Sequence, residues 1–522
     1  MTDPWEQSSN AFRRHHGLLT AGKSMAPNIA PLPVTRTAHR LLPDPERVIT
    51  KPFLLGTDVL TNGKSRFQSV LDRILTIPEA QIPGTLEEIL RHFSSRHRDF
   101  EGSLDDCFDV VSQYIRDSES LSRERRRLIG AYCSHEYSIE AAALCNPSIV
   151  AAPDQSGLPD GSARFIMSVR AIGEGHISSI EFRSGVIDVG HNITLDSMSP
   201  FALTGRRLAS PSYRRKIFES KLRELGFENP VSRWVLERLA DRFSLEELMS
   251  VIARSGHQDV PAPLKRETIE VIHWLATSNY DVVFPPGSTI SERVIFPDSP
   301  TESRGMEDAR FVRFIDDDGS KCYYATYTAF DGHDILPQLI ETNDFLQFKI
   351  RTLNGTGAQN KGMALFPRRI GGKFAMLSRH DGESLYYMAS ENIRFWHDVE
   401  VLRMPRRHWE MIQIGTCGSP IETEEGWLVL THGVGPMRTY AIGAMLLDLE
   451  DPSRVIGELP GPLLAPETDE REGYVPNVVY TCGGLLHNGQ VIIPYGFSDV
   501  GIRIATVPLD ELLARLQDQV DA

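Results

Sequence analysis

Short apolar runs recur at close intervals from Ala141 almost to the end of the chain, each bounded by glycine, proline, aspartate or asparagine. Such runs with turn residues between them are typical of antiparallel sheets. Their repeated grouping predicts a mainly β fold, either a propeller or a large sandwich. No short fixed repeat is evident, so periodicity alone gives no number of blades. The clearest predicted strands are Met363–Pro367, Lys373–Ser378, Leu385–Ser390, Trp427–Thr431, Ile442–Leu447, Val478–Cys482, Val491–Tyr495 and Ile502–Val507.

Two stretches have a helical pattern instead. From about Arg66 to Ile129, apolar residues such as Phe67, Val70, Leu71 and Ile74 recur at three- and four-residue spacing, which predicts a small helical domain. A second stretch, from about 210 to 278, is predicted to be an insertion because strand patterns resume after Tyr280. The predicted layout is a flexible N-terminal arm (1–45), a helical domain (46–135), a β domain (136–513) with a helical insertion (about 206–280), and a C-terminal tail (514–522).

Composition limits the kinds of partner that the chain can bind and the cellular compartment in which we expect it. The net charge of −15 disfavours nucleic acid and anionic membranes as partners, although a local basic pocket could hold a small anion. No stretch reaches the roughly 18 apolar residues of a membrane span, and the N-terminus lacks the apolar core of a secretory signal. Six cysteines without CxxC spacing predict neither a zinc site nor a disulfide framework. We therefore expect a cytoplasmic protein without a metal.

One segment matches a phosphate-binding motif in its residue types and spacing but not in its sequence context. Residues Gly17–Ser24 match the spacing of a P-loop, but Arg13-Arg14-His15-His16 precedes them and Met25-Ala26-Pro27 follows. The motif needs a buried strand before it and a helix after it. A chance match in the arm is therefore the preferred interpretation.

A charged cluster lies just before a predicted hairpin. Arg304, Glu307, Asp308 and Arg310 surround Gly305 and precede two strand patterns that are separated by an acidic turn ending at Gly319. Carboxylates and arginines at the entrance to a sheet indicate a site where neighbouring charges tune one carboxyl group. A surface network of salt bridges is the alternative, and residue types alone do not decide between them.

Several loops at strand ends carry polar groups among small residues. Lys361 precedes one predicted strand, Arg379 follows the next, and His432 ends a third. If such loops converge on one pocket, these three side chains would supply the cations that hold a phosphate. Solvated surface positions are the alternative for each one alone. Gln413, in a glycine-rich turn, and the Tyr474–Asn477 segment belong to the same set of loops.

With these residues in view, the chain resembles glycoside hydrolase family 130, the β-mannoside phosphorylases and related mannosidases. The likeness covers roughly 140–513 apart from the insertion, and the N-terminal helices resemble a longer-chain branch of the family. The resemblance implies a five-bladed β-propeller. It rests on GMEDAR at Gly305–Arg310, KGMALFPRRIGGKFAMLSR at Lys361–Arg379, GSPIETEEGWLVLTHGV at Gly418–Val434, LLDLEDPSRVIG at Leu446–Gly457 and EREGYVPNVVYTCG at Glu470–Gly483.

The resemblance also implies an inverting phosphorolysis with Asp308 as the general acid. Its proton would pass through a mannose hydroxyl to the glycosidic oxygen, while phosphate attacks the anomeric carbon and releases mannose 1-phosphate. Inorganic phosphate would be the co-substrate, with no further cofactor. Because phosphate brings its own nucleophilic oxygen, a cationic pocket replaces the second carboxylate of an inverting hydrolase. The implied phosphate contacts are Lys361, Arg379, His432 and Gln413, and the implied sugar contacts are Arg170, Glu307, Arg310, Tyr474 and Asn477.

Two positions depart from the pattern of the family. Gln413 stands where many of its phosphorylases have lysine, and Tyr474 stands where they often have a sugar-binding aspartate. The first leaves hydrolysis open, with Glu422 or Glu424 as nearby carboxylates, and the second leaves the sugar open. A mannosyltransferase and a non-catalytic carbohydrate-binding propeller are further alternatives. The expected partners are a β-mannoside oligosaccharide and phosphate, and a homo-oligomer is a further candidate.

Overall fold

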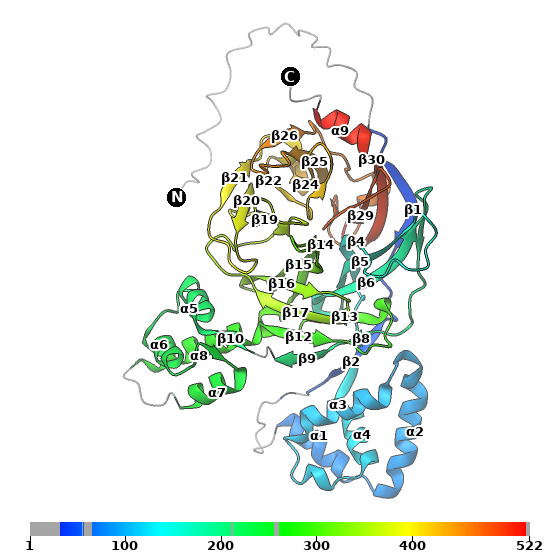
Figure 1. Cartoon of the computed structure of the whole chain (residues 1–522). Coiled ribbons are helices and arrows are strands. Elements are labelled where there is room, and N and C mark those ends of the chain that lie inside the picture. Colours follow the sequence, from blue (N-terminus) through cyan, green and yellow to red (C-terminus); the bar gives the residue numbers. More distant parts are fainter. Residues whose placement is uncertain (1–31, 55, 57–64, 210–211, 255–259, 518–522) are drawn as a thin grey trace, which may run out of the picture.

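The computed structural model describes residues 32–54, 56, 65–209, 212–254 and 260–517. In this part of the chain, antiparallel sheets are arranged around a common centre, with helices at the periphery (Figure 1). The prediction of a mainly β fold is therefore confirmed, and the count of five blades stays a prediction. Among the described helices, none is both long enough and apolar enough to cross a bilayer.

The largest sheet consists of two groups of mostly antiparallel strands. They meet where β6 and β14 run parallel and Gly305 pairs with Ser178. Large aromatic side chains, including Phe182, Phe311 and Phe348, fill the core beneath this sheet. Its strands are β4 (Ala143–Ala151), β5 (Ala163–Ile172), β6 (Ser178–Ile187), β7 (Ile193–Leu195), β8 (Leu203–Thr204), β9 (Arg206–Ala209), β12 (Tyr280–Val283), β13 (Arg293–Ile295), β14 (Gly305–Ile315), β15 (Lys321–Phe330), β16 (Ile335–Thr342) and β17 (Gln347–Thr352).

Three smaller sheets follow in chain order, and each packs an apolar face against the next. The short apolar runs that predicted these strands place their apolar side chains between neighbouring sheets. The first contains β18 (Ala364–Leu365), β19 (Phe374–Ser378), β20 (Leu385–Ser390) and β21 (Glu400–Arg403); the second contains β22 (Gln413–Thr416), β23 (Ile421–Glu422), β24 (Trp427–Val434), β25 (Tyr440–Leu447) and β26 (Val455–Glu458); the third contains β27 (Val479–Tyr480), β28 (Leu485–His487), β29 (Gln490–Phe497) and β30 (Gly501–Pro508).

The last sheet gains a strand from the N-terminal segment. Strand β1 (Thr35–Leu41) pairs antiparallel with β30, from Thr35 opposite Thr506 to Leu41 opposite Ile502. The prediction of a flexible arm over 1–45 is therefore wrong for this part, because β30 offers an edge with which β1 pairs. Residues 1–31, including Gly17–Ser24, and residues 518–522 of the predicted tail lie outside the described residues.

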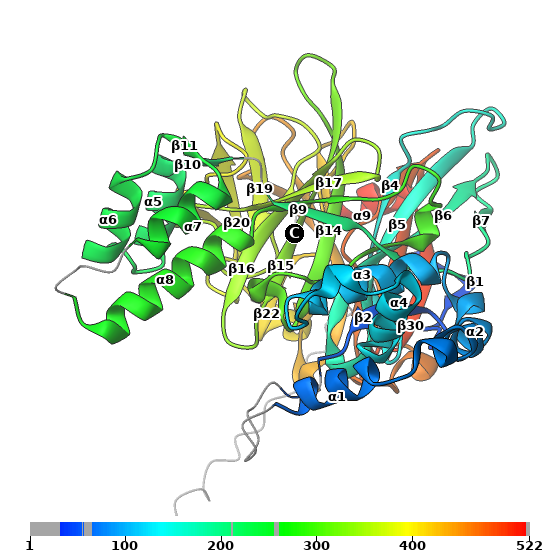
Figure 2. The ribbon, with the colours of Figure 1, turned by 90° about the horizontal axis from the view of Figure 1, so that it is seen from below.

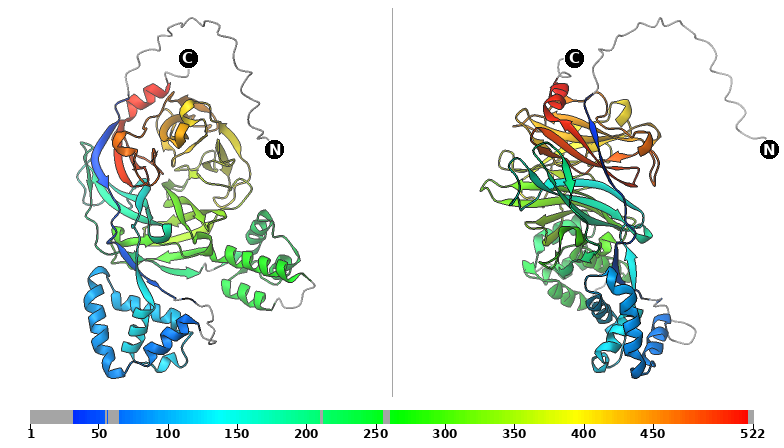
Figure 3. Two further views of the ribbon diagram at one scale, coloured as in Figure 1. Left: turned by 180° about the vertical axis from the view of Figure 1, so that it is seen from behind. Right: turned by 90° about the vertical axis from the view of Figure 1, so that its right-hand side faces the viewer.

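Two groups of helices lie at separate places on the periphery (Figures 2 and 3). A two-stranded ribbon, β2 (Val48–Pro52) with β3 (Ser134–Ser138), precedes and follows the first group in the chain. The predicted helices are present in both groups, while the domain boundaries stay a prediction. The first group contains α1 (Arg66–Leu75), α2 (Ile82–Phe93), α3 (Phe100–Ser112) and α4 (Arg123–Tyr132). The insertion contains α5 (Arg215–Glu224), α6 (Pro230–Glu237), α7 (Leu245–Ala253) and α8 (Ala262–Thr277), with the short strands β10 (Tyr213–Arg214) and β11 (Arg242–Phe243); helix α9 (Leu509–Gln517) follows β30.

Candidate active site

A β-bulge in β14 presents Asp308. The pairing of β14 with β15 shifts register between Glu307 and Arg310, and Asp308 has φ of 57°, in the left-handed region. A bulge of this kind re-aims a side chain that the regular pleat would point elsewhere. The strand begins at Gly305, where a Cβ atom would lie only 2.4 Å from the Ser178 hydroxyl oxygen. The first residues of the GMEDAR motif therefore position the carboxylate of Asp308.

A second bulge faces the first one. Strand β4 shifts register between Cys145 and Ser148, and Asn146 within it has φ of 48°. The Asn146 amide Nδ2 donates a hydrogen bond of 2.5 Å to Oδ1 of Asp308. Non-glycine residues in this backbone region are uncommon and gather at functional sites. The two bulges together fix the orientation of the Asp308 carboxylate.

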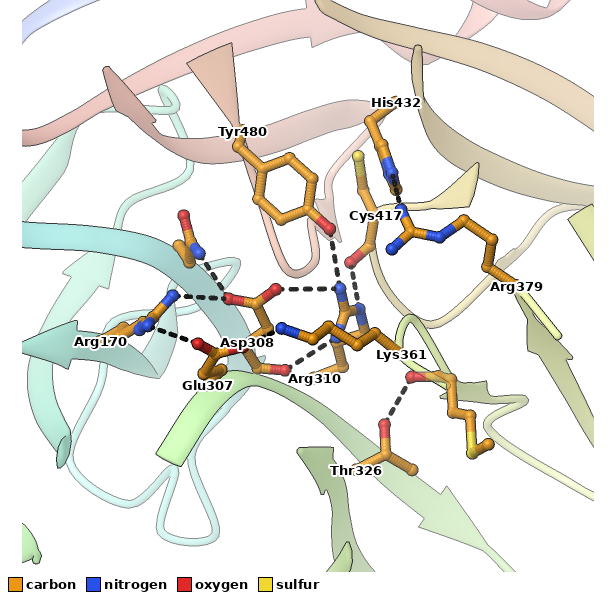
Figure 4. Close-up of polar contacts among 12 residues, drawn as sticks. Arg170, Glu307, Asp308, Arg310, Thr326, Lys361, Arg379, Cys417, His432 and Tyr480 are labelled. Atoms are coloured by element: carbon orange, nitrogen blue, oxygen red, sulfur yellow. Dashed lines mark hydrogen bonds and ion pairs between the residues drawn. The ribbon is translucent and has the colours of Figure 1, made fainter. Parts of the chain in front are cut away.

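Two arginines flank that carboxylate (Figure 4). Nη1 of Arg170 and Nη2 of Arg310 each lie 3.6 Å from an Asp308 oxygen. Arg310 is buried, and its guanidinium also donates to the carbonyls of Cys417 and Asp308 and to the Tyr480 hydroxyl at 2.8–3.0 Å. Arg310 thus connects β14 to the loop after β22 and to β27. Because the N–H donors of Arg310 bond to groups of the protein, its role is to hold the Asp308 carboxylate in place.

The surroundings of Asp308 set its charge. Burial alone would raise the pKa of this carboxyl, but the positive charges of Arg310 and Arg170, the Asn146 hydrogen bond and the charge of Lys361 together lower the pKa below its ordinary value. Asp308 is therefore ionised at neutral pH in the ligand-free protein. A proton must reach it before it can act as an acid.

Glu307 lies between two cations. It accepts from Arg170 Nη2 at 3.0 Å and from Lys361 Nζ at 2.5 Å. Lys361 follows Asn360, whose φ of 63° turns the chain before β18. The ion pair holds a lysine from the loop before β18 beside the acidic motif of β14, as the sequence predicted for a shared pocket.

Arg379 comes from the same sheet as β18, and His432 comes from the next sheet. Arg379 directly follows β19, and His432 lies within β24. An Nη1 donor of Arg379 lies 3.2 Å from His432 Nε2, which must accept because a guanidinium has no lone pair to offer. Burial and the charges of Arg379 and Arg310 lower the pKa of His432 well below its ordinary value. His432 is therefore neutral in the ligand-free protein, which corrects the prediction that it supplies a fixed positive charge.

These side chains line one cavity of about 260 Å³. Its walls carry five basic side chains and three carboxylates, so this cavity is net positive although the whole chain is strongly acidic. The predicted convergence of Lys361, Arg379 and His432 on Asp308 is present in the geometry. The lining residues are Asn146, Arg170, Glu307, Asp308, Arg310, Lys361, Arg379, His432, Arg438, Tyr440, Val475, Val478, Tyr480 and Asp499.

Three predicted site residues do not line this cavity. Gln413 lies behind His432, with its Nε2 atom 3.5 Å from His432 Nε2. The Tyr474 side chain is 61% exposed and its ring packs on that of His176. Asn477 accepts a hydrogen bond of 2.8 Å from Arg471 Nε. Glu422 and Glu424 are also absent from the lining, and Glu422 pairs with Arg368 at 2.7 Å.

The sequence did not point to Asn146, Arg438, Tyr440, Tyr480 or Asp499. Asp499 matters most among these, because burial raises the pKa of its carboxyl while Arg170 and Arg438 lower it less strongly. It lies in the turn between β29 and β30 with φ of 48°. A polar residue in the left-handed region at a turn looks like ordinary turn chemistry in the sequence. Only the fold shows that this turn faces Asp308.

Comparisons with known proteins identify relatives of this chain. A family model described as beta-1,4-mannooligosaccharide phosphorylase, of glycoside hydrolase family 130, matches residues 287–518. A 1,2-beta-oligomannan phosphorylase from Thermoanaerobacter sp. (strain X514) is 32% identical over 228 residues, which are 43% of this chain and 75% of the relative. A beta-1,2-mannobiose phosphorylase from the same organism is 34% identical over 224 residues, 42% of this chain and 72% of the relative.

Among solved structures, the beta-1,2-mannobiose phosphorylase from Listeria innocua in complex with beta-1,2-mannobiose superposes with a TM-score of 0.42 at 20% identity. The superposition covers 73% of this chain and 93% of that one. The range matched by the family model includes the GMEDAR motif and the segments that carry Lys361, Arg379 and His432. The chain therefore belongs to glycoside hydrolase family 130, a family of enzymes that act on mannosides.

Proposed function

We propose that this chain catalyses the inverting phosphorolysis of a β-mannoside. Phosphate attacks the anomeric carbon, the glycosidic C–O bond breaks, and the proton of Asp308 goes to the departing oxygen. The products are mannose 1-phosphate and an acceptor shortened by one sugar. The observation that carries the proposal is the placement of Asp308 in a cavity rich in basic side chains from several sheets. The names of the relatives, all mannoside phosphorylases, support the same reaction.

The cations are the natural contacts for phosphate. Arg379 has one side-chain partner among the described residues, His432, so most of its five N–H donors are free for an anion. Lys361 and Arg438 add charge to the same cavity. Guanidinium and ammonium groups in a partly desolvated pocket both orient phosphate and offset its charge. A neutral His432 contributes a hydrogen bond, or gains a proton when the dianion arrives.

Phosphate binding also explains how Asp308 gains the proton that it needs as an acid. In the free protein the surrounding cations keep this carboxyl ionised. A bound dianion offsets those cations and adds a negative charge nearby, and both effects raise the pKa of Asp308. The acid thus becomes protonated as the nucleophile binds. On this proposal, Arg170 and Glu307 contact the sugar next to Asp308, and the sheets form the five blades of a propeller around the site.

Asp499 supports a second candidate, hydrolysis. An inverting hydrolase needs a carboxylate base to activate water, and Asp499 is a partly buried carboxylate in the same cavity. Phosphorolysis remains the preferred function because water needs no cluster of cations to orient it.

A phosphate-dependence assay separates the two candidates. The enzyme is incubated with β-1,2- and β-1,4-linked mannobioses and longer oligomers, with and without phosphate, and mannose and mannose 1-phosphate are measured. Phosphorolysis predicts mannose 1-phosphate that requires phosphate and persists in Asp499→Asn. Release of free mannose without phosphate, abolished in Asp499→Asn, would show that the enzyme is a hydrolase.

A further inference from the structure

A second cavity lies between the helical insertion and the sheets. It has a volume of about 360 Å³ and shares no lining residue with the Asp308 cavity. The insertion side is formed by β10, β11 and the first turns of α5, and the sheet side by the end of β17 and the loop after β20. In Figures 1 and 2 the insertion helices lie beside this edge of the sheets. Such a volume is within the range of small-molecule sites.

The walls of this cavity are strongly basic. They carry five basic side chains and one acidic side chain, Glu341. Two of the five are neutralised locally, since Lys221 pairs with Glu224 at 3.2 Å and Arg351 pairs with Asp281 at 2.6 Å. Glu341 is itself paired with Lys349 at 2.7 Å. In the part of the chain that the structure describes, no carboxylate lies within 4.0 Å of the three remaining guanidinium groups, those of Arg214, Arg242 and Arg394.

Two of these three arginines face each other across a strand pair. Arg214 of β10 is directly opposite Arg242 of β11 in the antiparallel register. Like charges in directly opposite positions destabilise a strand pair, because their Cβ atoms lie only about 5 Å apart. This repulsion destabilises a ribbon of only two residues per strand, where few other contacts offset it. An anion bound between the two guanidinium groups would turn the repulsion into attraction.

The third arginine reaches the cavity from the sheet side on an anchored backbone. The Arg394 backbone N–H donates to Asn392 Oδ1 at 3.0 Å, and its carbonyl accepts from the Asn354 backbone N–H at 2.9 Å. Desolvation and the nearby charges of Arg351 and Arg214 lower the pKa of the Arg394 guanidinium. Positive groups from the insertion and from the sheet therefore meet at one point without a matching anion.

We propose that this cavity binds a phosphate-bearing small molecule, held by Arg214, Arg242 and Arg394 at the junction of the insertion and the sheets. A planar guanidinium group can bind two phosphate oxygens at once. A phosphate ester offers three such oxygens to the three arginines. Phe218, Leu275 and Ile393 give the same cavity an apolar wall for the uncharged body of the ligand. The site is separate from the Asp308 cavity, so the inference does not depend on the proposed reaction.

The test measures binding of glucose 6-phosphate and inorganic phosphate to the full-length protein by calorimetry. The double variant Arg214→Gln/Arg242→Gln removes two of the three cations, and Arg266→Gln, an exposed arginine of α8 outside the cavity, is the matched control. Arg379→Ala weakens phosphate binding in the Asp308 cavity instead. Loss of two charge-assisted contacts predicts an affinity at least about tenfold weaker in the double variant.

Retention of this binding in Arg379→Ala and Arg266→Gln, with its loss in the double variant, supports the proposal. Tighter binding of the ester than of phosphate identifies a phosphate ester, and equal binding identifies free phosphate. Because the proposed function also places phosphate in the Asp308 cavity, the double variant is measured in the Arg379→Ala background. Binding that survives there, or an absence of binding outside the Asp308 cavity, overturns the proposal. Since Arg214 and Arg242 repel each other, the ligand-free double variant is expected to melt no lower than the native protein. Arg394→Gln repeats the test from the opposite wall should the double variant fail to fold.

Discussion

At the scale of single residues, the candidate site depends on backbone conformations that side-chain types do not favour. Asn146, Asp308, Arg438 and Asp499 all have positive φ and all line the Asp308 cavity. Each such conformation costs on the order of 1 kcal/mol or more outside glycine. The surrounding sheet hydrogen bonds and ion pairs must compensate this cost. The strain is therefore concentrated where carboxylates and cations have to be aimed at a shared point.

Replacement of Asp308 by asparagine tests its role as the proton donor. We expect kcat on a mannobiose with phosphate to fall by about 10²–10⁴, the usual contribution of a general acid. The loss should be much smaller with 2,4-dinitrophenyl β-mannoside, whose leaving group departs without a proton. Initial rates on both substrates check this, with sugar binding by calorimetry as the control for folding. Equal losses on the two substrates would mean that Asp308 acts in some other way.

His432→Gln tests the neutral state of that imidazole through stability. Burial and nearby cations lower the pKa of His432 in the folded protein below its ordinary value of 6.5, so the unfolded chain binds the proton more strongly. Folding is therefore weakened as pH falls from 6.5 toward the lowered pKa. The loss amounts to about 1.4 kcal/mol per pH unit. Glutamine cannot be protonated, so the variant should lack this part of the slope.

Urea unfolding of both proteins at pH 7.5, 6.5 and 5.5 measures these slopes. Asp308 does not interfere, since its pKa is lowered from 3.8 and the stability it contributes is lost only below that range. Parallel pH profiles for native protein and variant would show that His432 is not held neutral by the fold.

Only part of the site could be predicted from the sequence. Asp308, Lys361, Arg379 and His432 follow from motifs, and the structure brings them together. Asn146 and Asp499 could not be found, because their placement depends on the register of a bulge and on which turn faces the centre. The lowered pKa of His432 could not be predicted either, because its burial and its closeness to Arg379 arise only in the fold.

At the scale of elements, most strands were predictable because their apolar residues alternate or form short runs between turns. Strand β1 was not, since Thr35–Leu41 is polar and lacks that pattern. It forms because β30 has an unpaired edge and because Arg36 reaches the buried Glu470. Arg36 Nη2 lies 3.3 Å from Glu470, whose side chain is fully buried, and Arg36 Nη1 lies 2.7 Å from Glu467. Pairing with a distant segment is a tertiary effect that local propensity does not record.

Arg36→Ala tests whether this ion pair holds β1 on the sheet. It leaves Glu470 buried with the Tyr495 hydroxyl, Arg503 and the Glu467 backbone N–H as its remaining partners, at 2.6, 3.1 and 3.0 Å. Removing one member of a buried pair is costly, and with partial compensation we expect a loss of roughly 2–3 kcal/mol in unfolding free energy. Thr35→Ala, an exposed position on the same strand, is the control. Thermal melts of the two variants that coincide would contradict this account of β1.

At the scale of the whole molecule, a buried network of charges joins the N-terminal ribbon to the largest sheet. Arg47, next to β2, pairs with Glu140 at 2.7 Å and with Glu181 of β6 at 2.9 Å. Arg183 pairs with the same two carboxylates at 2.7 and 3.3 Å, and all four side chains are at most 5% exposed. Burial and the charge of Glu181 raise the pKa of Glu140. The two carboxylates thus repel each other and depend on both arginines.

A double-mutant cycle tests this dependence. Arg47→Met fills similar space but removes one cation, so Glu140 and Glu181 would share Arg183 alone, and we expect a loss of about 3–5 kcal/mol in unfolding free energy. Adding Glu140→Gln removes one of the two repelling carboxylates and should restore at least about 1 kcal/mol of that loss, because residues of one charge network couple by such amounts. Urea unfolding of the native protein, both single variants and the double variant gives the coupling. Strict additivity would show that the four charges stabilise the junction independently, and that the ribbon does not rely on their mutual balance.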